Sequence, residues 1–438
     1  VRKFKYGFVF IQLSSRRMIG AGHKTFLYVC CFVCSLASSL IPDTAAKSQT
    51  PNPHHDHPND KDDRDAIIQI GLFDLRPTLS VSEEFSDNIF LSDRHKKSDQ
   101  ISRIAPALTL QSNWQRARLR LIALGEAGFY AQSDDDDYLD GETGISGGFD
   151  IGPALAIDGK LNLAQHHEDR GGNDIPTGAT EPVLYTEQSG EIAIRYIAGD
   201  IRYRTVLARR NLDFDDSTLA GGTIGNNDDR DRTETRIVMR ASYPLGRGRA
   251  VFGETAFNQR EYTNLPDDQG IYRDSTGYRF YTGMTFDVTN LIDADIGAGW
   301  MTQIYEDPVL QTNEGLSLRA TVNWHVTRLT TLDFRARRDI DETTVTGASG
   351  IISEEFDFGV DHELRRWLRL RFNGGYEQDH FEGTKRTDQI LRLGAGLRYD
   401  LNRFADLDAS WRFDERHSDE TGHDYQRNRA LLTLRLKM

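Results

Sequence analysis

Apolar and polar side chains alternate along the last segment of the chain. The apolar positions are Ala430, Leu432, Leu434, Leu436 and Met438, and the positions between them are Leu431, Thr433, Arg435 and Lys437. Successive side chains of a strand point to opposite faces, so this pattern predicts a strand with one apolar and one mostly polar face. Such a strand is typical of a transmembrane β-barrel, where one face meets lipid and the other meets the lumen.

The same two-faced pattern recurs along the chain after about residue 70. Clear examples are residues 278–288, 316–326, 391–400 and 405–414. In the second of these, Trp324 and its apolar neighbours lie opposite Arg319 and His325. A soluble β-sandwich also alternates, but it does not normally carry arginine and aspartate on so many consecutive polar faces. We therefore prefer the barrel.

Short and long connections alternate between the predicted strands. Short connections are expected at residues 112–115, 152–156, 198–200, 244–249, 288–291, 326–329, 364–367 and 400–404. Long acidic loops are expected at residues 87–99, 133–141, 166–182, 211–232, 261–275, 306–314, 339–351, 378–388 and 415–424. Outer-membrane barrels show this asymmetry, with short periplasmic turns and longer extracellular loops. We predict an all-β, antiparallel, up-and-down transmembrane barrel of about 18 strands (16–18).

Aromatic residues near the short turns predict a girdle at the membrane interface, where amphipathic rings are favoured. They are Trp114, Tyr243, Trp300, Trp324, Trp367, Tyr399 and Phe404. Strands favour aromatic residues in any case, so an incidental distribution is the alternative.

An apolar run at residues 26–40 precedes the small residues Thr44, Ala45 and Ala46. The run is too short to span a bilayer, and with the basic residues before it the segment is typical of a secretory signal peptide. We expect a signal peptide over residues 1–46, with Met18 as the candidate true start. Residues 47–70 are rich in Pro, Asp and His and are expected to form a disordered periplasmic leader. Residues 71–438 are expected to form the barrel.

Metal and cofactor sites are not expected. His54, His55 and His57 of the leader could bind a metal ion, but no preformed geometry would hold them, and a solvated tail is the preferred interpretation. The three cysteines are Cys30, Cys31 and Cys34. Because all of them lie in the predicted signal peptide, we expect no disulfide and no thiol nucleophile in the barrel.

Charge and motifs exclude several function classes. The net charge of −14 argues against nucleic acid as a partner. Acidic loop segments such as 134–137 and 228–229 are interpreted as solvated, with weak calcium binding as the alternative. Neither an H-E-x-x-H sequence nor a P-loop is present. We expect no enzyme and no catalytic residues.

Charged residues on the polar faces predict a water-filled lumen. The candidate lumen residues are Arg319, Arg335, Arg337, Arg369, Arg371, Arg392, Arg398, Asp287, Asp293 and Asp295. Arginine binds carboxylates through a rigid planar fork, so an arginine band on one side of the lumen would favour anionic solutes. The alternative is that these charges pair across strands and hold the wall rigid.

Residues 71–90 carry the sequence P-x-L-x-V-x-E-x-F-x-D-N from Pro77 to Asn88. With the chain length, the hairpin repeat and the arginine-rich faces, this segment resembles the β-barrel porin-2 family of Gram-negative outer-membrane proteins over roughly residues 70–438. The resemblance implies an outer-membrane location and a secretion role like that of exopolysaccharide-export pores. One departure is Met438, where barrel proteins usually end in Phe.

These observations lead to one main functional hypothesis and two alternatives. We expect an outer-membrane pore that exports polysaccharide or passes polar and anionic solutes. A structural or adhesive surface barrel plugged by its own loops is the second hypothesis, and an outer-membrane enzyme the third. Expected partners are outer-membrane lipids and lipopolysaccharide, the barrel assembly machinery and periplasmic polysaccharide-export proteins.

Overall fold

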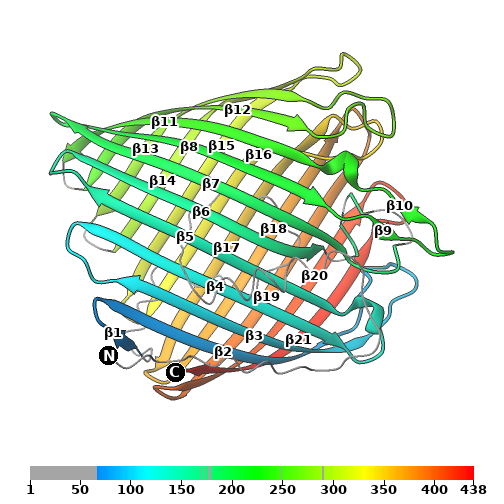
Figure 1. Ribbon diagram of the computed structural model, residues 1–438, viewed down its shortest axis with the longest axis horizontal. Coiled ribbons are helices and arrows are strands. Elements are labelled where there is room, and N and C mark those ends of the chain that lie inside the picture. The colour runs from blue at the N-terminus through cyan, green and yellow to red at the C-terminus, as the bar shows by residue number, and fades with distance from the viewer. Residues whose placement is uncertain (1–66, 169, 173, 176–178, 247, 289–290) are drawn as a thin grey trace, which may run out of the picture. The chain divides into compact units, whose positions relative to one another are not determined.

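The computed structural model describes residues 67–438 except residues 169, 173, 176–178, 247 and 289–290. The predicted signal peptide, its cysteines and the leader histidines lie outside the described residues. Among the described residues, 18 long strands form one antiparallel sheet that closes on itself as a barrel (Figure 1). The predicted fold class and strand number are therefore confirmed.

The barrel strands follow one another around the wall in chain order. Their bounds are β2 Phe73–Ser86, β3 Asp99–Ser112, β4 Ala117–Tyr130, β5 Tyr138–Asp150, β6 Leu155–Glu168, β7 Val183–Ala198, β8 Ile201–Phe214, β11 Arg232–Gly246, β12 Arg249–Tyr262, β13 Ser275–Val288, β14 Ile292–Tyr305, β15 Asn313–Thr327, β16 Thr330–Asp341, β17 Gly350–Arg365, β18 Leu368–Glu382, β19 Thr387–Asn402, β20 Ala405–Ser418 and β21 Tyr425–Lys437. Each strand pairs with its predecessor and its successor, so consecutive hairpins build the whole wall.

The last strand closes the ring, as its alternation predicted. β21 pairs antiparallel with β2, from Lys437 opposite Thr78 to Arg429 opposite Ser86. Leu432 of β21 is 49% exposed on the outer face, whereas Lys437 is only 6% exposed on the inner face. Alternate residues therefore meet different surroundings, which is the arrangement that a barrel wall between lipid and lumen requires.

A short strand precedes the barrel wall. β1 (Ile68–Ile70) forms a hairpin with the start of β2, and Gly71 at the turn has a φ of +62°. Glycine takes this left-handed conformation without a steric penalty. Residues 68–70 were predicted as the end of a disordered leader, and that boundary was wrong by these residues, since their backbone groups pair with β2.

The short connections lie where the sequence predicted them. Several leave only two residues outside strands, for example residues 199–200 between β7 and β8, 328–329 between β15 and β16, 366–367 between β17 and β18, and 403–404 between β19 and β20. Among the long connections, the loop predicted at 378–388 is present but shorter, because β18 continues to Glu382 and β19 begins at Thr387. This segment is polar because the ends of β18 and β19 carry polar residues on both faces. A smaller hairpin, β9 (Ser217–Thr218) with β10 (Ile224–Gly225), lies in the loop after β8.

Aromatic residues gather at both ends of the outer face. Near the turns, Phe73 packs edge-on against Trp114 with ring centroids 5.5 Å apart, and Trp367 packs against Tyr399 at 5.2 Å. Trp300, which the sequence assigned to the turn side, lies closer to the loop end of β14, at Tyr305, than to its turn end, at Ile292. It therefore lies near the middle of the strand and not at its turn end.

Helices contribute little to the described part of the chain. Two single turns of 3₁₀-helix, η1 (Asp134–Asp136) and η2 (Asp228–Arg230), lie in loops. No helix in the described residues has the length and apolar character needed to cross a membrane.

Candidate functional site: the barrel lumen

Every second residue of each strand points to the inner wall. Residues that pair across neighbouring strands lie on the same face, so the pairing identifies the inward-facing positions around the whole barrel. All the predicted lumen residues lie on this face. Representative register pairs are Asp287–Asp293, Asp295–Thr321, Arg319–Arg337, Arg335–Asp357, Arg371–Asp361, Arg369–Arg398 and Arg392–Asp414. Because charged groups inside a membrane barrel need water or partners, these pairs define the surface that a solute in the lumen would meet.

Carboxylates interrupt the arginine band that the sequence suggested. The ion pairs are Arg337–Glu355 at 3.4 Å, Arg371–Asp361 at 2.9 Å, Arg392–Glu377 at 2.5 Å and Arg398–Asp406 at 3.1 Å. The acidic partners come from β17, β18 and β20, between and beside the arginine-bearing strands. The expected segregation of arginines from carboxylates is therefore absent along this part of the described wall, and cross-strand pairing, the stated alternative, describes these residues better.

Glu254 on β12 is the centre of a charged cluster. Its two carboxylate oxygens accept hydrogen bonds from Arg319 at 3.1 Å each, and Arg240 donates to it at 3.4 Å. Asp295 accepts from Arg240 at 2.5 Å and lies 3.8 Å from Arg319. The side chain of Glu254 is only 8% exposed, so its charge is stabilised mainly by the two guanidinium groups. The cluster joins β11, β12, β14 and β15.

Glycines make room for this cluster. A Cβ atom on Gly283 would lie 2.6 Å from the Phe252 ring, and one on Gly297 would lie 3.1 Å from it. The ring therefore lies flat against β13 and β14, and the Arg240 guanidinium stacks 3.5 Å from its centroid. Glu254 was not among the predicted lumen residues, although its position between Phe252 and Ala256 on an alternating strand indicates that it faces inward.

Loops pack against one another at the end of the barrel where the long connections gather (Figure 1). Arg273, before β13, is 1% exposed and pairs with Asp267 at 2.6 Å. It also donates to the carbonyl oxygens of Thr343 at 3.1 Å and Ala348 at 3.3 Å, in the loop between β16 and β17. Glu342 of the same loop accepts a hydrogen bond from Tyr262 at 2.7 Å and pairs with Arg260.

A second set of contacts links loops from distant parts of the wall. Asp174, between β6 and β7, accepts hydrogen bonds from the Thr343 hydroxyl at 2.6 Å and the Thr344 amide at 2.9 Å. Asp136, in an acidic run interpreted as solvated, is instead 3% exposed and pairs with Arg170 at 2.5 Å. These contacts bring polar and charged groups of several loops together at this end of the barrel.

Two carboxyls of the loop between β8 and β11 titrate near neutral pH. Burial, reinforced by the nearby charge of Asp268, raises the pKa of Asp229 to about 6. Burial also raises the pKa of Asp231 to about 6, against the opposing effect of a hydrogen bond from the Phe214 amide at 2.7 Å. Both groups lose charge as the medium is acidified through pH 6.

We expect Asp229→Asn to stabilise the protein at neutral pH. The pKa of Asp229 in the folded protein lies above its ordinary value. The ionised carboxyl therefore lowers the free energy of unfolding above pH 6, and this effect vanishes below about pH 4. The partly exposed site makes the gain small, on the order of 1 °C in the thermal midpoint at pH 7.5. Circular dichroism in detergent measures it. Asp93→Asn, at an exposed loop carboxylate, is the control, and a gain from Asp229→Asn that persisted at pH 4 would contradict the assignment.

The inner wall nearer the turns is more accessible. Several inward-facing charged side chains there are exposed: the cations Arg118, Arg195, Arg202, Arg204, Arg335 and Arg371, and the carboxylates Asp287 and Asp293. Cations thus predominate among the exposed inward-facing charges of the described wall. Glu377, Asp379 and Asp388, at the loop ends of their strands, are at most 2% exposed.

One sequence fits the pattern of a hydrolase nucleophile. Residues 144–148 read G-x-S-x-G, but they lie within strand β5 and do not form the strand-to-helix turn that exposes a nucleophile. Ser146 is 5% exposed. Among the described residues, no group of three or more His, Cys, Asp or Glu side chains is placed to hold a metal ion.

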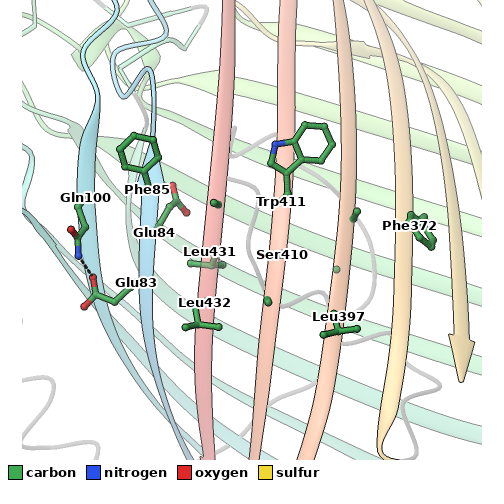
Figure 2. Close-up of a pocket in the computed structure, with 14 residues that line it drawn as sticks. Glu83, Glu84, Phe85, Gln100, Phe372, Leu397, Ser410, Trp411, Leu431 and Leu432 are labelled. Carbon is green, nitrogen blue, oxygen red and sulfur yellow. Dashed lines mark hydrogen bonds between the residues drawn. The ribbon is translucent and has the colours of Figure 1, made fainter. Parts of the chain in front are cut away.

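A pocket lies on the other side of the wall, beside the closing strands. Figure 2 shows Phe85, Trp411 and Leu432 around it, and all three belong to the outer face. Glu83 at its edge accepts a hydrogen bond from Gln100 at 2.9 Å. Because most of its lining faces lipid, this pocket is not part of the lumen.

Comparison with known proteins decides the family. The family described as "Putative beta-barrel porin 2" matches residues 66–438. The chain belongs to this family. The match covers the whole described barrel, so the resemblance inferred from the sequence is confirmed. No curated protein matches the chain.

Solved structures with a similar course of the chain include proteins of two bacteria. OccAB4 of Acinetobacter baumannii is 13% identical, with 84% of this chain and 99% of that chain covered and a TM-score of 0.46. OccK2 (OpdF) of Pseudomonas aeruginosa, solved in complex with glucuronate, is 10% identical, with coverage of 83% and 98% and a TM-score of 0.45.

Proposed function

We propose that this member of the family is a channel of the bacterial outer membrane that passes small polar solutes and prefers anions. The observation that carries the proposal is the excess of arginine among the exposed inward-facing charges at the turn end. Guanidinium groups lining a narrow aqueous path attract anions and repel cations. Membership in a porin-like family supports the outer-membrane location and the role as a pore.

Polysaccharide export is the second candidate, and family resemblance is its main support. A polymer would need a wide exit. The contacts among the loops, such as those of Arg273 and Asp174, instead favour a narrow mouth. We therefore favour small solutes over a polymer as the substrate. The arginine-lined wall is compatible with either one.

Planar-bilayer recording tests the proposal. We expect the refolded protein to form discrete channels, with a reversal potential in a potassium chloride gradient that indicates chloride preference. Replacing Arg335 and Arg371, which both face the lumen and are exposed, by Gln should shift the reversal potential toward that of a cation-selective pore. Absence of channels from well-folded protein would instead support the plugged structural barrel, and cation preference in the parent would contradict the proposed selectivity.

A further inference from the structure

Three consecutive hairpins end in the same kind of turn, at the end of the barrel opposite the long loops (Figure 1). The two turn residues are Arg328–Leu329 between β15 and β16, Arg366–Trp367 between β17 and β18, and Arg403–Phe404 between β19 and β20. In each turn an arginine is followed by a large apolar residue. The two-residue turn between β7 and β8, Gly199–Asp200, has neither feature.

The three turns share one backbone setting. The strand before each turn shifts its register by one residue, between His325 and Thr327, between Glu363 and Arg365, and between Asp400 and Asn402. The carbonyl oxygen of the second turn residue accepts a backbone hydrogen bond from the next hairpin, at 2.7 Å for Leu329, 2.9 Å for Trp367 and 2.8 Å for Phe404. The turns therefore follow one another along the rim at two strand spacings, or roughly 10 Å.

Both side chains of each turn are exposed. Leu329, Trp367 and Phe404 are 50%, 47% and 46% exposed, and the arginines before them are exposed as well. The Trp367 ring packs against Tyr399 of the outer face, with ring centroids 5.2 Å apart. The Arg403 guanidinium lies 4.5 Å from the centroid of the Phe404 ring. Cationic and apolar groups thus lie side by side at these turns, and Trp367 lies on the lipid-facing side of the wall.

The carboxylates nearest to these turns along the chain belong to the inner face. Glu363 pairs in register with the inward-facing Arg369, and Asp400 with the inward-facing Asp406. Acidic runs such as residues 134–137 lie in the loops at the opposite end of the barrel. The exposed tips of these three hairpins are therefore positively charged where they meet the surface of the membrane.

From this arrangement we infer that Arg328, Arg366 and Arg403, called here the arginine arc, bind the head groups of anionic phospholipids in the leaflet at the turn end of the barrel. A guanidinium fork donates parallel hydrogen bonds to a phosphate, and basic side chains at a membrane surface attract anionic lipids. The large side chain beside each arginine suits the boundary between head groups and hydrocarbon. An acidic protein would also attract the arginines, but this repeated apolar neighbour favours a lipid.

Electron spin resonance of spin-labelled lipids tests the inference without requiring that the pore conducts. The probes are phosphatidylglycerol and phosphatidylcholine, which differ in the net charge of the head group, in bilayers that contain the refolded protein. We expect the protein to associate with phosphatidylglycerol at least about twofold more strongly at low salt. The preference should fall in 1 M potassium chloride, where the screening length is about 3 Å. Equal association with the two lipids at low salt would overturn the inference, and is the result expected if the arc binds an acidic protein instead.

A triple variant locates the preference at the arc. Replacing Arg328, Arg366 and Arg403 together by Gln should bring the association of the two lipids close to equality. The matched control replaces three exposed cations of the long loops by Gln, namely Arg94, Lys96 and Lys385. It changes the net charge equally and should keep the preference of the parent. Heat-modifiable migration on gels verifies folding of both variants. An equal loss of preference in the control, or an undiminished preference in the arc variant, would refute the assignment to these turns.

Discussion

Leu434→Arg is expected to prevent assembly of the barrel. Leu434 faces outward on β21, and it pairs with Val81 of β2 across the seam that closes the ring. An arginine on the lipid face costs roughly 2–4 kcal/mol at the middle of the membrane and less toward its surfaces. Here it would also stand beside the pairing of β21 with β2 that closes the ring. We expect the fraction of heat-modifiable, folded protein to fall at least tenfold relative to the parent.

Arg435→Ala is the matched control for this variant, since it changes the neighbouring residue on the opposite face. Arg435 faces the lumen, where water and other charged residues surround it, so its loss is expected to leave most of the protein folded. The reverse result, loss of folding with Arg435→Ala but not with Leu434→Arg, would mean that the two faces are exchanged. A slip of one residue in register has that consequence.

The architecture could be predicted because the alternation of apolar and polar residues within each strand shows on which face each side chain lies. The alternation at 430–438 alone gave the orientation of Leu434 and Arg435, and the short connections were placed correctly because tight turns interrupt that alternation. Composition is a weaker guide to where a strand leaves the membrane. For that reason the predicted loop 378–388 took in the ends of β18 and β19, and Trp300, near the middle of β14, was assigned to the turn side.

The partners of the charged residues could not be predicted from the sequence. Glu254 and Arg319 are three strands apart in the wall, and they meet because two long side chains reach across the glycines of β13 and β14. Alternation shows on which face a side chain lies. It does not show how the strands tilt or how far neighbouring side chains extend.

Arg273→Leu is expected to loosen the loops at the end of the barrel where the long connections gather. The Arg273 side chain, 2% exposed, pairs with Asp267 and binds two carbonyl oxygens of the loop between β16 and β17. Removing one member of a buried ion pair costs on the order of 3–5 kcal/mol, because the remaining charge is left without its partner. Loop contacts at a solvent-facing mouth are too weak to absorb that cost. The loops at 263–274 and 342–349 should therefore separate.

The separated loops should raise the single-channel conductance severalfold and make both loops sensitive to proteolysis in the otherwise folded barrel. Arg94→Leu is the control, because Arg94 is a loop arginine whose side chain is 82% exposed, and it should change neither measurement. If proteolysis increased while the conductance stayed at the parent value, the loops would pack as inferred without limiting flow. The narrowest part of the path would then lie deeper, at the level where Arg204, Arg240 and Glu254 line the wall.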